Sequence, residues 1–63
     1  VYKRQVNTFT LWINWTEDGV DNIEHFDNLS RVALRRYLDY FLSTRKISAY
    51  EVYEWSAKTG ALL

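Results

Sequence analysis

The chain has 63 residues, with eight acidic and eight basic side chains, one histidine and no cysteine. This length supports a single domain, and the lack of cysteine excludes disulfides, thiolate metal sites and cysteine nucleophiles. A formal charge of zero argues against a generic binder of nucleic acid or membrane surfaces, which would usually be basic. Because a domain of this size buries only about 60% of its unfolded surface, we expect aromatic packing or oligomerisation to support its stability.

The first five residues differ in character from the rest. Residues 1–5 resemble the translated linker found at the edges of open reading frames in environmental sequence collections. We therefore expect a non-native or disordered extension there, a single domain over 6–63, and a microbial or viral accessory protein. Neither a membrane-spanning apolar stretch nor a signal-peptide core is visible, so the sequence predicts a cytoplasmic protein.

The first half of the domain has the pattern of a β-hairpin. Residues 6–16 alternate apolar and polar side chains, as a half-buried strand does. Asp18-Gly19 follows, and Gly tolerates the positive φ of a type I′ turn. The polar second strand, about 20–26, suits a sheet edge. The turn predicts these pairs: Glu17 with Val20, Trp15 with Asn22, Ile13 with Glu24, and Leu11 with Phe26.

An amphipathic helix is predicted next, over 29–44. Asn28 is the expected N-cap, because its side-chain oxygen can accept from N–H groups of the first turn. The apolar side chains repeat at helical spacing on one broad face. They are Ala33, Leu34, Tyr37, Leu38, Tyr40 and Phe41.

The last segment supports two interpretations. Residues 47–56 are rich in Ile, Tyr, Val and Trp, which favours a strand, followed by a turn around Gly60 and a short return strand at 61–63. The alternative is a helix over 49–59, since Ser48 and Glu51 fit a capping box. We favour the strand because a two-stranded sheet is rarely stable by itself.

The predicted fold is therefore α+β. It is a small two-layer β-β-α-β-β domain, in which one amphipathic helix covers one face of a four-stranded antiparallel sheet. The alternative fold is a β-hairpin followed by two helices.

The sequence predicts no enzyme, cofactor or metal site. His25 is the only histidine, and scattered neighbouring acids and Ser30 do not establish a catalytic triad. We expect His25 to be a surface residue stacked beside Trp12, on the face of the hairpin that also carries Ile23.

Eleven aromatic residues among 63 exceed what one small core easily hides, so a contact surface is expected. Trp and Tyr supply much of the binding energy at protein interfaces. We predict a homo-oligomer or a partner-binding module, with the bare sheet face or an edge as the contact. The predicted anchors are Trp12, Ile23, Tyr53 and Trp55.

The alternative function is single-stranded nucleic-acid binding. Basic side chains in and after the predicted helix could follow a phosphate backbone, and aromatic side chains could stack on bases. The basic patch consists of Arg31, Arg35, Arg36, Arg45 and Lys46.

Overall fold

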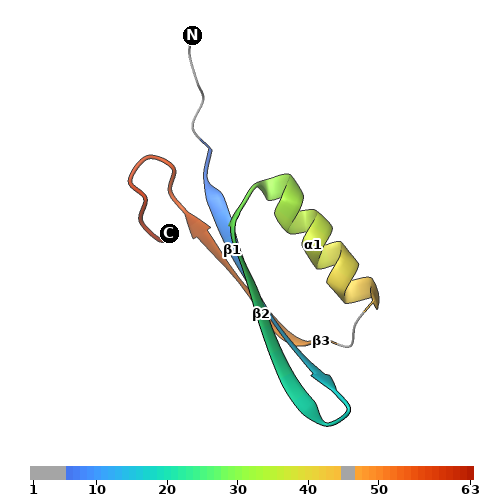
Figure 1. Cartoon of the computed structure of the whole chain (residues 1–63). Coiled ribbons are helices and arrows are strands. Elements are labelled where there is room, and N and C mark those ends of the chain that lie inside the picture. The colour runs from blue at the N-terminus through green and yellow to red at the C-terminus, as the bar shows by residue number, and fades with distance from the viewer. Residues whose placement is uncertain (1–5, 45–46) are drawn as a thin grey trace.

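A computed structural model describes residues 6–44 and 47–63 and shows three strands and one helix in that part of the chain (Figure 1). The elements are β1 (Thr8–Glu17), β2 (Val20–Leu29), α1 (Arg31–Thr44) and β3 (Ile47–Trp55). The sheet is antiparallel with the order β2-β1-β3, so the first strand is central and the other two are edges. The helix lies against one face, which makes a two-layer α+β domain.

The predicted β-β-α-β-β order is wrong in its last strand. Among the described residues, segment 61–63 makes only a single bridge, between Leu62 and Trp55. The turn before it is held by Ser56, whose hydroxyl accepts from the N–H groups of Lys58 and Thr59 at 3.2 Å each. The turn therefore extends to Gly60, whose N–H donates to Ser56 O at 2.8 Å, and the described residues after it form one bridge in place of a strand.

The alternative fold with a second helix is also wrong, because Ile47–Trp55 is a strand. Its nine residues include Ile, Val, two Tyr and Trp, the types that fit a pleated surface best. The capping-box pattern at Ser48 and Glu51 is not used, because this segment pairs with β1 over most of its length.

The hairpin turn and its register are as the sequence predicts. Asp18 and Gly19 have φ angles of 52° and 77°, the two positive values that a type I′ turn requires. All four predicted pairs are present, from Glu17 with Val20 to Leu11 with Phe26.

The second strand runs three residues further than predicted because it contains a β-bulge. Phe9 pairs with Leu29 and Leu11 with Phe26, so β2 has one more residue than β1 between these pairs. Asn28 lies in the bulge with a φ of 58°. The bulge directs Leu29 into the core, where it is 8% exposed.

The helix cap differs from the prediction for the same reason. With Asn28 used in the bulge, Ser30 is the N-cap, and its hydroxyl accepts from the N–H of Ala33 at 3.1 Å. The helix therefore begins at Arg31 instead of residue 29, and it ends at Thr44 as predicted.

The core lies between α1 and the β1–β2 half of the sheet. Leu11 and Ile13 are fully buried, so each contributes about 1.5–3 kcal/mol by burial. Helix α1 packs over β1 and β2 and leaves much of β3 uncovered. The buried apolar side chains among the described residues are Phe9, Leu11, Ile13, Trp15, Leu29 and Phe41.

Candidate interaction surface

The sheet face opposite α1 carries the aromatic side chains that the core does not use. Alternate residues of a strand point to opposite faces. The even-numbered residues of β1 point to this face, and the residues paired with them on β2 and β3 therefore lie there too. We call this surface the open face. It consists of Thr10, Trp12, Ile23, His25, Asp27, Glu51, Tyr53 and Trp55.

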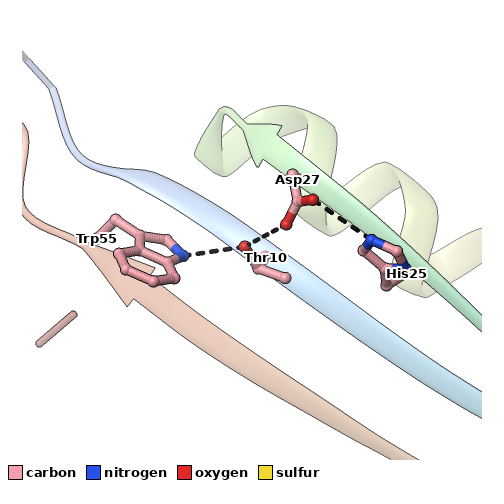
Figure 2. A network of polar contacts seen from close by, with 4 residues as sticks. All are labelled: Thr10, His25, Asp27 and Trp55. Atoms are coloured by element: carbon pink, nitrogen blue, oxygen red, sulfur yellow. Dashed lines mark hydrogen bonds and ion pairs between the residues drawn. The ribbon is translucent and has the colours of Figure 1, made fainter. Parts of the chain in front are cut away.

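A chain of polar contacts crosses all three strands on the open face (Figure 2). The indole N–H of Trp55 donates to Thr10 Oγ1 at 2.9 Å, and this hydroxyl donates to Asp27 Oδ1, also at 2.9 Å. His25 Nε2 lies 3.4 Å from the other carboxylate oxygen of Asp27. Thr10 is only 5% exposed, so its two hydrogen bonds are shielded from water and fix the plane of the Trp55 ring.

Two rings stack at the centre of the open face. The centroids of Trp12 and His25 lie 4.5 Å apart with 17° between the ring planes. This confirms the prediction that His25 is a surface residue stacked beside Trp12. The contact links β1 to β2 and holds the Trp12 ring in one orientation while 39% of that residue stays exposed.

Tyr53 is held by its neighbour on the same face of β3. Its hydroxyl donates a hydrogen bond to the carboxylate of Glu51. This hydrogen bond, the negative charge of Glu51 and a smaller desolvation effect raise the pKa of Tyr53 above its ordinary value. The hydroxyl of Tyr53 is therefore already paired within this face.

These side chains surround a shallow hollow of about 390 Å³. Aromatic rings form its walls, a carboxylate lies at its side, and Leu62 closes one end through its bridge to β3. Its lining consists of Thr10, Trp12, His25, Asp27, Tyr53, Trp55 and Leu62. The mixture of apolar rings and satisfied polar groups is typical of a surface that binds another molecule.

The structure brings the four predicted anchors together on the open face. Ile23 is 64% exposed, Trp12 39% and Trp55 36%, while Tyr53 is half-buried. Their role in binding remains a prediction, but their common location is that expected from strand alternation.

The predicted basic patch is not next to these aromatic side chains. Arg31, Arg35 and Arg36 lie on α1, in the opposite layer of the domain. The guanidinium of Arg31 lies 5.3 Å from the Phe9 ring centroid, where it covers the end of the core. Arg45 and Lys46 lie outside the described residues.

His25 and Ser30, the residues considered for a catalytic triad, make separate contacts. His25 and Asp27 form a pair, but the neighbouring Ser30 is engaged as the helix cap. Within the described ranges, no group of three or more His, Asp or Glu side chains is placed to hold a metal ion.

Sequence reasoning missed two groups of residues. It did not include Thr10 and Asp27, although Thr10 has the same strand parity as Trp12. It also missed Tyr50 and Val52, which lie on the helix side of β3 but are 48% and 40% exposed because α1 does not reach them. Strand alternation places both on the covered face, and no local signal shows how far a helix extends across a sheet.

Comparisons with family models, curated proteins and solved structures give no significant match for this chain. In the part of the chain that the structure describes, no helix has both the length and the apolar character needed to cross a bilayer.

Proposed function

We propose that this chain is a small non-enzymatic interaction module that self-associates or docks on a partner protein through exposed aromatic surface. One observation carries the proposal: Trp12, Ile23, Tyr53 and Trp55 share the open face, and the three aromatic residues among them line a single hollow. Contiguous exposed apolar surface of this kind usually marks an interaction site.

The polar atoms of these aromatic residues are already paired, which favours burial by a partner. The indole N–H of Trp55 is bound to Thr10 and the hydroxyl of Tyr53 to Glu51. Burying a polar group costs free energy unless it keeps a hydrogen bond. A partner that covers this face therefore gains apolar contact without leaving either donor unpaired.

The geometry of the anchors also lowers the entropic penalty of binding. Trp12 is fixed by the His25 ring and Trp55 by the Thr10 hydroxyl. Side chains that are immobilised before binding lose less freedom when the complex forms. Trp and Tyr in such positions are the residue types that dominate measured interfaces.

Truncation of the anchors tests the proposal. We expect Trp12→Ala and Trp55→Ala to stay folded, by circular dichroism, and to weaken self-association in sedimentation experiments. Tyr40→Ala is the matched control, because Tyr40 is 55% exposed on the helix layer. Equal effects of all three substitutions, or no association of the unmodified chain, would count against this surface.

Nucleic-acid binding remains the second proposal, although the charge distribution does not favour it. The open-face rings have Asp27 and Glu51 beside them, and the described arginines lie on the other layer. Phosphates would be repelled by these carboxylates. Binding of a single-stranded oligonucleotide that weakens steeply with added salt would support this function over protein docking.

A further inference from the structure

The outer edge of β3 is a second exposed surface, distinct from the open face. In the order β2-β1-β3, β1 is the one strand that pairs with β3 among the described residues, and Leu62 adds a single bridge at its end. An edge strand presents unpaired N–H and C=O groups that can accept another strand. The β3 edge is therefore a second place, besides the open face, where another chain can bind.

The backbone contacts show which residues present these groups. Glu54 O accepts from Leu63 N at 2.8 Å, and Ser56 N donates to Ala61 O at 2.9 Å. These groups of Glu54 and Ser56 point away from β1. Because hydrogen-bonding direction alternates along a strand, Val52 and Tyr50 present theirs to the same outer edge. The C-terminal segment occupies the edge at Glu54, and the free part lies before it.

Tyr50 and Val52 also expose apolar side chains. Tyr50 pairs with Ile13 and Val52 with Leu11, so both lie on the helix side of the sheet. They are 48% and 40% exposed, although Leu11 and Ile13 beside them are fully buried. Free backbone groups and uncovered apolar side chains therefore occur together along the middle of β3.

We infer that β3 pairs antiparallel with β3 of a second copy, about a two-fold axis at Tyr50, to form a continuous six-stranded sheet. This inference rests on the self-association in the proposed function and adds to the open face a second contact, at the sheet edge. In this register Tyr50 faces Tyr50 of the other copy, and both residues present outward backbone groups. Glu51 faces Ala49 of the second copy, so no pair of like charges is opposed.

Neighbouring registers are less favourable. An axis at Glu51 would still pair the outward backbone groups of Tyr50 and Val52, but it would place two carboxylates directly opposite each other. An axis at Val52 would place Tyr50 opposite Glu54, whose carbonyl is already used by Leu63. The Tyr50 register avoids both problems.

The other edge of the sheet is protected. Strand β2 carries Asp21, Glu24 and Asp27 and has a bulge at Asn28. Charges and bulges are the features that keep natural edge strands from pairing. The middle of β3 carries fewer charges, with Glu51 alone between Ala49 and Tyr53, and its own register shift lies at its start, between Ile47 and Ala49.

A charge substitution tests the inference in the intact chain. Tyr50→Lys places two like charges opposite each other across the axis, and we expect its dissociation constant to rise roughly tenfold or more. Tyr40→Lys is the matched control, since it makes the same change at a 55% exposed tyrosine of α1 and should leave the constant unchanged. Circular dichroism establishes that both variants are folded.

A cysteine crosslink provides a second, independent readout, because the natural chain has no cysteine. Residues opposed in a hydrogen-bonded antiparallel pair have Cα atoms about 5.5 Å apart, within disulfide range. We expect Tyr50→Cys to form a covalent dimer under mild oxidation, and Tyr40→Cys, at a 55% exposed position of α1 outside both proposed contacts, to form none.

The outcomes separate this inference from the proposed function. A dimer that is weakened by Tyr50→Lys and crosslinked through Tyr50→Cys supports the edge contact. A dimer that is insensitive to Tyr50→Lys but lost in Trp12→Ala overturns the edge contact and leaves the open face as the interface. A chain that is monomeric at all concentrations overturns self-association and the edge contact together.

Discussion

The two faces of β1 show how one strand serves two purposes. On the helix side, Leu11 and Ile13 are completely buried and Trp15 is 7% exposed. On the other side, Trp12 is 39% exposed and stacks on a histidine. Two tryptophans three residues apart therefore occupy different environments. Strand parity, and not residue type, decides which aromatic side chain stabilises the fold and which is available to a partner.

The largest expected difference between the faces comes from these two tryptophans. Trp15→Ala should lower the free energy of unfolding by about 3–5 kcal/mol, because it leaves a cavity in the core. Trp12→Ala should lower it by about 1 kcal/mol or less, as exposed substitutions do. Urea denaturation at a protein concentration below association measures both. Equal losses would mean that the open face is a second core.

Removal of the buried Thr10 hydroxyl on the open face should have the next largest effect on stability. Thr10→Val removes the group between Trp55 and Asp27, and we expect a loss of about 1–3 kcal/mol because a shielded indole N–H loses its acceptor. Thr16→Val is the matched control, since it removes an exposed hydrogen bond to Asp21 on the same strand. Thermal unfolding of the two variants should differ clearly; similar midpoints would show that the polar chain contributes little.

The helix that covers the other face can be loosened at its cap. Ser30→Ala should cost about 1 kcal/mol, because it removes the acceptor for the Ala33 N–H. Asn28→Gly should change stability by less than about 0.5 kcal/mol, since glycine readily adopts the positive φ found there. Chemical denaturation compares the two. A larger loss of stability for Asn28→Gly than for Ser30→Ala would indicate that Asn28 is the helix cap.

The smallest expected effect concerns the titration of Tyr53. Replacing Glu51 by Gln removes the negative charge, so the raised pKa of Tyr53 should fall towards its ordinary value. Because the folded-state pKa is raised, the associated stability is present below the ordinary tyrosine pKa and is lost as pH rises through the folded value. An NMR titration of the tyrosine ring carbons measures the shift. An unchanged Tyr53 pKa would mean that Glu51 does not act on it.

The sequence predicted the parts of this fold that local chemistry controls. The Asp18-Gly19 turn determines the hairpin register, and the apolar spacing predicted the helix up to Thr44. The favoured strand assignment for the segment after the helix was also correct. In each case the deciding signal lies within a few neighbouring residues.

The remaining features depend on contacts between distant parts of the chain. The bulge at Asn28 moves the helix cap to Ser30, and two caps only two residues apart cannot be ranked by composition. The missing fourth strand depends on how the Ser56 turn closes. The exposure of Tyr50 and Val52 depends on where α1 crosses the sheet. The grouping of the four anchors on one face was predictable, whereas the β3 edge was not.

Sedimentation of the unmodified chain over a wide concentration range tests the central claim most directly. We expect the average mass to rise from the 7.6 kDa monomer towards twice that value. Tyr50→Lys should shift this rise to higher concentration, and Tyr40→Lys should leave it in place. A constant 7.6 kDa species at every concentration would contradict this expectation.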